Sequence, residues 1–191
     1  MSTGTEENAR SGSAEDIRGD GQSTSPTADS RWPAVQPWLS LAARLGLAGV
    51  LGYAGYTKLV VPALSVESVA AYELFSDGVN QFIGYTLPLF EIALALLLLT
   101  GLATRVTGAV SALLMAVFIA GIASAWARGL SIDCGCFGTG GAVDPDETAY
   151  GLDIARDLGF MALGLFLAVW PRSRFSLDRV LGLYPGSERQ R

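Results

Sequence analysis

The chain has 191 residues, of which 50% are hydrophobic and 16% charged, with a formal net charge of −5. This composition is typical of one membrane domain rather than a soluble domain. The acidic balance and the lack of a basic stripe exclude nucleic acid as a partner. Histidine is absent, which excludes a Ser-His-Asp catalytic site.

The chain starts with a polar segment. Residues 1–31 are rich in Ser, Thr, Gly, Asp and Glu, and Ile17 is their only large aliphatic side chain after Met1. Such a segment buries too little apolar surface to offset the entropy lost on ordering. It lacks the basic start and apolar core of a signal peptide. We therefore expect residues 1–37 to be a disordered cytoplasmic tail, and residues 172–191 to form a second cytoplasmic tail.

Four apolar runs follow, each close to the length of about 20 residues that crosses the hydrocarbon of a bilayer. They cover residues 38–59, 82–102, 106–127 and 151–170. Glycines recur on neighbouring turns of the first run, and small residues let membrane helices approach closely. The first-run glycines are Gly46, Gly49, Gly52 and Gly55, with Gly101, Gly108 and Gly121 further along. The sequence predicts an all-α fold, an integral membrane four-helix bundle over residues 38–171.

Basic residues near the span ends predict the orientation of the chain in the cell membrane. Arg31 precedes the first run, Arg105 lies between the second and third, and Arg172, Arg174 and Arg179 follow the fourth. The connections at residues 60–81 and 128–150 are mainly acidic, with basic residues only at their edges. Because Lys and Arg concentrate in cytoplasmic loops, both termini are expected in the cytoplasm and both long connections outside.

The second long connection holds the chain's two cysteines in the string Asp133-Cys134-Gly135-Cys136-Phe137-Gly138. A disulfide across one residue gains little from loop-closure entropy, and strained, exposed disulfides are the readily exchanged ones. Both points favour a redox-active pair. A static disulfide and two inert thiols stay open, as does a soft-metal site shared with a partner chain. Two sulfurs are too few for a closed zinc site, so we assign no metal.

Charged neighbours set the reactivity of these cysteines, because the thiolate is the reactive form. Asp133 opposes thiolate formation. Lys58, Arg128 and Arg156 favour it if they lie close.

Ionisable residues also occur inside the predicted spans. Asp153, Arg156 and Asp157 share one helix face and are expected to pair locally, to hold the cysteine loop or to pass protons near it. Glu91 lies near the middle of the second span, with Arg44 as its expected partner. An ionisable group at this depth is a functional hypothesis by default, and a structural ion pair or a neutral acid is the alternative.

Several of these elements, in this order, resemble the methylamine utilisation protein MauE family, relatives of the DoxX-like membrane proteins. They are Arg44, Gly52, Gly55, Lys58-Leu59, Pro88-Leu89-Phe90-Glu91, Arg128-Gly129, Asp133-Cys134-Gly135-Cys136-Phe137-Gly138 and Arg156-Asp157. The resemblance implies a four-helix membrane protein that supports disulfide formation outside the cytoplasm. It also implies a thioredoxin-like partner and a disulfide-bearing client of the methylamine dehydrogenase type.

The arrangement is also similar to the vitamin K epoxide reductase group, which uses quinone, so quinone is the candidate cofactor. This chain departs from that group in having Cys-x-Cys and no second cysteine pair.

Two hypotheses follow from the sequence. In the first, the chain is a membrane thiol-disulfide redox factor whose Cys134 and Cys136 exchange electrons with a partner protein or a quinone. Lys58, Asp133, Arg156 and Asp157 then support the thiols, while Glu91 and Arg44 stabilise or gate the bundle. In the second, the chain is a non-catalytic assembly factor or small-molecule carrier, in which the cysteines shape a loop and Glu91 is the working residue.

Overall fold

The computed structural model describes residues 32–135, 141–144, 146, 148–171 and 177, with the backbone alone for residues 32–34. The chain divides into two units, Met1–Ser30 and Arg31–Arg191, and the following description concerns the second. Several sequence-based expectations fall outside the described residues: Cys136, the orienting residues Arg31, Arg172, Arg174 and Arg179, and most of both tails.

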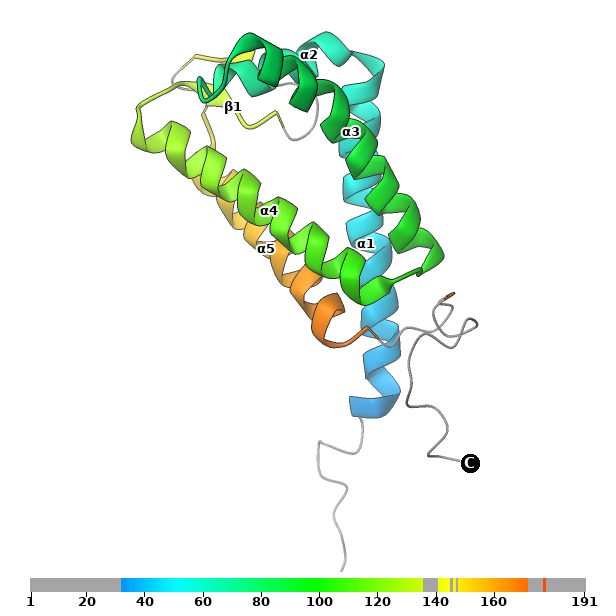
Figure 1. Cartoon of the computed structure of the whole chain (residues 1–191). Helices are drawn as coiled ribbons and strands as arrows, with labels where there is room; N and C mark the ends of the chain where they lie inside the picture. Colours follow the sequence, from blue (N-terminus) through cyan, green and yellow to red (C-terminus); the bar gives the residue numbers. More distant parts are fainter. Residues whose placement is uncertain (1–31, 136–140, 145, 147, 172–176, 178–191) are drawn as a thin grey trace, which may run out of the picture. The chain divides into compact units, whose positions relative to one another are not determined.

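The described part is mainly helical, which confirms the all-α class (Figure 1). The elements in chain order are α1 (Trp32–Val60), α2 (Pro62–Ala71), α3 (Asp77–Thr100), α4 (Thr104–Ala127), β1 (Ile132–Asp133), β2 (Gly141–Ala142) and α5 (Tyr150–Val169). Each of the four apolar runs forms a long helix: α1, α3, α4 or α5. Helix α1 begins at Trp32, so residues 32–37 belong to a helix and not to the tail in which the sequence placed them.

The first long connection contains a helix that the sequence analysis did not predict. Pro62 opens α2, since a proline at the first helical position has no N–H left unpaired. The residue before a proline is driven out of helical geometry, and Val61 has φ −131° and ψ 77°. Helix α2 therefore turns away from α1 by 105°.

A hydrogen bond joins α2 to α3 next to a proline. Pro88 lies inside α3 and has no N–H to donate to the carbonyl of Gly84, one turn earlier. The hydroxyl of Ser65 in α2 donates to that carbonyl at 2.7 Å. A Cβ on Gly84 would lie 2.7 Å from Cα of Val66, so the two helices touch at backbone distance.

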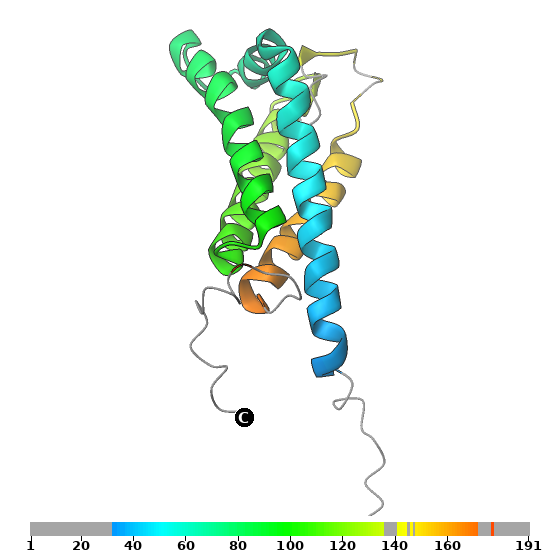
Figure 2. The ribbon, with the colours of Figure 1, turned by 90° about the vertical axis from the view of Figure 1, so that its right-hand side faces the viewer.

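The long helices pack in pairs, α1 along α3 and α4 along α5, and α1 also contacts α5 (Figures 1 and 2). Their shared core is aliphatic and includes Leu47, Leu51, Leu94, Leu98, Met115 and Leu167. At one end, Gly101 closes α3 in a left-handed conformation (φ 67°) and α4 begins at Thr104. At the opposite end, α2 contacts β2, which brings the two long connections together.

Within the described residues, two helices, α3 and α4, are long and apolar enough to cross a membrane, and the number rises to three if the bent pair of α1 and α2 counts as one span. Helix α5 is not among them, because Asp153, Arg156 and Asp157 interrupt its apolar sequence. The helices expose many large apolar side chains, among them Phe82, Leu89, Leu96, Val106 and Leu113, as lipid contact requires. The fold thus supports two or three of the four expected spans.

The glycines fall into two groups, those at which two helices touch and those that face open space. A Cβ on Gly108 would lie 2.9 Å from the carbonyl oxygen of Gly164, and a Cβ on Gly164 would lie 2.8 Å from that of Gly108. Helices α4 and α5 therefore touch through these two glycines. Gly55 makes a similar approach to Pro88 and Ile92. Gly46 and Gly49 have open space where a Cβ would lie, so the packing role expected for them is wrong.

These contacts predict the effect of adding one methyl group. Gly164→Ala should destabilise the protein by about 1–3 kcal/mol, because the methyl group overpacks the contact between α4 and α5. Gly159→Ala on the same helix meets nothing within 4 Å and should gain up to about 1 kcal/mol from helix propensity. Thermal unfolding in detergent measures both variants. Equal melting temperatures for the two would contradict the close contact.

Candidate functional site

Cys134 lies at the base of a small hairpin. Ile132 pairs with Ala142 and Asp133 with Gly141, so the chain from Cys134 onwards forms the connection between the two antiparallel strands. Gly135, the spacer between the two cysteines, has φ 66°, a left-handed conformation that favours glycine. Its N–H donates to Oδ1 of Asp133 at 3.4 Å. The spacer thus turns the backbone directly after Cys134.

Two tyrosines hold this hairpin against the helices. The hydroxyl of Tyr72, just after α2, donates to the carbonyl of Cys134 at 3.0 Å. The hydroxyl of Tyr150, the first residue of α5, accepts from N–H of Ile132 at 2.9 Å and donates to the carbonyl of Leu130. Sequence reasoning missed both residues. The position of Tyr150 at the end of the cysteine connection was a usable signal, whereas nothing local marked Tyr72.

Arg128 also acts on the hairpin supports rather than on sulfur. Its guanidinium donates to the carbonyl of Tyr72 at 2.5 Å and to that of Ser124 at 3.2 Å. The predicted role of Arg128 in promoting the thiolate has no support in these contacts.

Arg156 of α5 reaches the cysteine, as the sequence predicted. Its Nη2 donates to Sγ of Cys134 at 3.5 Å. The same guanidinium pairs with Asp153 at 2.9 Å and with Asp157 at 3.1 Å. We call Cys134, Asp153, Arg156 and Asp157 the thiol cluster. The expected local pairing of the three α5 residues is confirmed.

The buried carboxylate of Glu91 pairs with Lys58, not with Arg44. Nζ of Lys58 lies 2.6 Å from Oε1 of Glu91, and the two residues are 3% and 0% exposed. The expected pairing with Arg44 is therefore wrong. Helices α1 and α3 run antiparallel, and Gly55 of α1 lies against Pro88 and Ile92 of α3. Lys58 is hence the basic residue at the level of Glu91.

Arg44 is itself buried, at 2% exposure. It lies fourteen residues before Lys58 in α1, about 21 Å along the helix at 1.5 Å per residue. It belongs to the opposite end of the bundle from the thiol cluster.

The side chain of Lys58 lies in the interior of the bundle. Besides its bond to Glu91, its ammonium lies 5.5 Å from the ring centroid of Phe118 in α4, within cation-π range. The predicted direct action of Lys58 on the cysteines finds no contact among the described residues.

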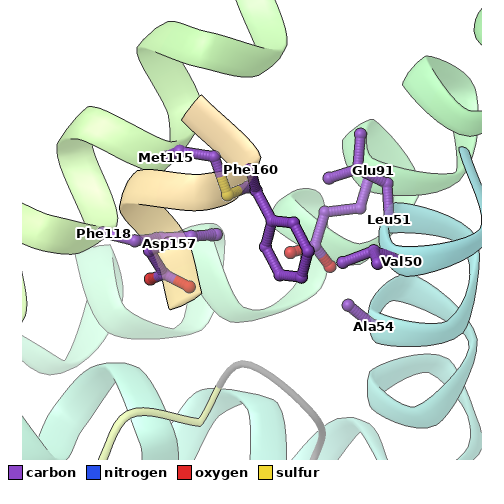
Figure 3. Close-up of a pocket in the computed structure, with 8 residues that line it drawn as sticks. All are labelled: Val50, Leu51, Ala54, Glu91, Met115, Phe118, Asp157 and Phe160. Atoms are coloured by element: carbon purple, nitrogen blue, oxygen red, sulfur yellow. The ribbon is translucent and has the colours of Figure 1, made fainter. Parts of the chain in front are cut away.

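A small cavity separates the ion pair from the thiol cluster. Its volume is about 20 Å³, and all four long helices line it. The lining residues are Val50, Leu51, Ala54, Glu91, Met115, Phe118, Asp157 and Phe160. Figure 3 shows Glu91 on one side of the Phe160 ring and Asp157 on the other. The cavity therefore joins a member of the ion pair to a member of the thiol cluster.

The ion pair yields a stability prediction. Replacing one partner leaves the other as an unpaired buried charge, so Lys58→Met and Glu91→Leu should each cost about 3–5 kcal/mol. Replacing both, as in Lys58→Met with Glu91→Leu, removes the buried charge and should recover most of that loss. Thermal unfolding of the four proteins in one detergent gives the comparison. Two silent single variants, or a double variant as unstable as the sum of its parts, would show that the two side chains are not paired.

Comparison with known proteins relates this chain to one family. No curated protein and no solved structure matches the chain. The family model of the methylamine utilisation protein MauE matches residues 36–171, which include α1 through α5 almost entirely and every member of the ion pair and the thiol cluster. With its apolar helices, the chain is a membrane protein, and it belongs to the MauE family.

Proposed function

We propose that the chain is a membrane thiol-disulfide redox factor that forms disulfides in extracytoplasmic proteins. The observation that carries this proposal is the hydrogen bond from the Arg156 guanidinium to Sγ of Cys134. A guanidinium beside a sulfur favours the thiolate, which is both the attacking and the leaving form in disulfide exchange. A cysteine that served only to shape a loop would need no such partner.

The chemistry proceeds by exchange. A thiolate of the client attacks Cys136 in the Cys134–Cys136 disulfide, and Sγ of Cys134 leaves as a thiolate held by Arg156. The second client thiolate then attacks the mixed disulfide, which releases the client disulfide and leaves both cysteines reduced. Two electrons and two protons have passed to this chain. A thioredoxin-like protein in its disulfide form, or a quinone, accepts them and restores the starting state.

Carboxylates near Arg156 weaken its stabilising effect on the Cys134 thiolate. Asp153 and Asp157 share its charge, and Asp133 adds a carboxylate next to Cys134 in the sequence. The sulfur therefore faces a cation whose charge is offset by neighbouring carboxylates rather than a bare one. This balance suits a cysteine that has to leave and attack in turn, because a thiolate that is stabilised too far is a poor nucleophile.

The orientation of the chain completes the proposal. The two long connections lie at one end of the helices, where α2 contacts β2. We place this end outside the cell membrane, in a compartment where disulfides persist, and both termini in the cytoplasm. We retain four spans, α5 included, because Arg156 pairs with both of its aspartates and Leu152, Leu165 and Val169 are exposed for lipid.

The proposed client is an extracytoplasmic protein with disulfides, and the resemblance to the MauE family implies one of the methylamine dehydrogenase type. The Lys58–Glu91 pair holds α1 to α3, and Arg44 supports the opposite end of the bundle.

Serine substitution distinguishes the redox factor from an assembly factor. The double variant Cys134→Ser, Cys136→Ser keeps the size of both side chains and should abolish client disulfide formation in cells. Cys136→Ser should leave Cys134 able to attack the disulfide of the thioredoxin-like protein and to trap a mixed disulfide with it. This mixed disulfide is visible as a reducible band on a gel. Client disulfides are counted by mass tagging of free thiols.

The matched control for that experiment is Glu91→Gln, assayed at equal protein level. In a redox factor it lowers client oxidation only as far as it lowers stability. Full client oxidation with the double serine variant, together with its loss in Glu91→Gln, would refute the redox proposal and favour the assembly factor or carrier.

A further inference from the structure

The cavity between Glu91 and Asp157 contains two acceptors that lack donors. Oε1 of Glu91 is bonded to Lys58 and Oδ1 of Asp157 to Arg156. The second oxygen of each carboxyl group, Oε2 of Glu91 and Oδ2 of Asp157, is buried and has no hydrogen-bond partner among the described residues. Both residues line the same cavity, and they are 0% and 2% exposed. A buried carboxylate oxygen without a donor is costly, so a donor is expected there.

The size and chemistry of the cavity select the donor. A cavity of about 20 Å³ exceeds the roughly 10–15 Å³ that one water molecule needs. The rest of the lining is apolar or aromatic, so it offers no competing hydrogen-bond partner. A water molecule has two O–H donors, one for each carboxylate oxygen. No other small molecule is required to satisfy both atoms.

We propose that one water molecule in this cavity, at the edge of the Phe160 ring, donates to Glu91 and Asp157 and so links the ion pair electrostatically to the thiol cluster; we call this water-mediated coupling of charges the relay. The linked groups run from Cys134 through Arg156 and Asp157 to the water, then to Glu91 and Lys58. Figure 3 shows Asp157 and Glu91, the two that line the cavity. This inference deepens the proposed function and rests on it for its use: the charges around Arg156 set how readily the Cys134 thiolate forms.

The relay predicts how the cavity acts on Cys134. Without the water, the Asp157 carboxylate loses a donor and its neutral form is favoured. Arg156 then keeps one anionic partner fewer and stabilises the Cys134 thiolate more strongly. Expelling the water should therefore make Cys134 more reactive at low pH. The charged and titratable groups on the elements packed against the hairpin are Arg156, Asp153 and Asp157 of α5, Asp133 of β1, Arg128 after α4, Glu67 of α2 and Tyr72 after it.

The test uses the full chain with Cys136→Ser, in which Cys134 is the single cysteine and forms no internal disulfide. The rate of its alkylation by iodoacetamide is measured against pH, in detergent. Ala54→Val fills the cavity without changing any charge and should move the profile to lower pH, with a several-fold higher rate below the midpoint. Asp157→Asn should move it the same way. Ala48→Val, buried in the same helix but outside the cavity lining, is the matched control and should leave the profile in place.

A structure of the wild-type chain at a resolution that shows ordered waters provides a second readout, which stands even if Ala54→Val does not fold. It should show a water within hydrogen-bond distance of Oε2 of Glu91 and Oδ2 of Asp157. An Ala54→Val profile that coincides with the control, or a map with no water between the two oxygens, overturns the relay. Either result leaves the proposed function standing, because neither readout depends on client oxidation. Loss of the proposed function would show instead as normal client disulfides with the double serine variant.

Discussion

The interaction on which the arrangement depends is the ion pair of Lys58 and Glu91. Its members come from α1 and α3, they are almost fully buried, and their charged atoms lie 2.6 Å apart. Taking two charges out of water is expensive, and their mutual attraction offsets that cost only at close range with good geometry. The pair therefore fixes the register of α1 against α3, and glycine contacts such as that of Gly55 with Pro88 allow the approach.

The same constraint extends to the cysteine. Arg156 pairs with Asp153 and Asp157 of its own helix, and its Nη2 also donates to Sγ of Cys134. The hairpin could not hold the sulfur there unaided, since each of its strands is two residues long. The hydroxyls of Tyr72 and Tyr150 supply the missing anchorage. The position of the thiol thus depends on α2, α5 and the hairpin together.

Sequence reasoning predicted the parts of this molecule that follow from local pattern. The long apolar runs gave the helices, and Arg156 with its two aspartates followed from helical spacing. Glu91 stood out because an acid in an apolar helix needs a partner. The choice of Arg44 as that partner failed, because it depended on which turn of α1 lies beside Glu91, a matter of helix register that spacing within one helix cannot reveal. Spacing likewise could not show that Lys58 lies beside Glu91.

Other features depend on contacts between distant segments. Helix α2 was taken for part of a loop, since ten residues with a low amphipathic signal give little periodicity to detect. Pro88 leaves a carbonyl of α3 without a donor, and Ser65 of α2 forms a hydrogen bond to it. Because this bond joins two helices, no pattern in either local sequence predicts it. The cavity between Glu91 and Asp157 is likewise a product of four helices meeting. The family match agrees with the resemblance, which was based on the order of motifs along the chain and not on these contacts.

The central claim is that Cys134 and Cys136 form an exchanging disulfide on the outer side of the membrane. The most direct measurement treats intact cells with a membrane-impermeant maleimide that adds mass to each free thiol, with and without prior treatment by an impermeant reductant. The account predicts a chain that is mostly untagged before reduction and carries two tags after it. Two tags without reductant in an oxidising medium, or tagging only after the membrane is permeabilised, would contradict it.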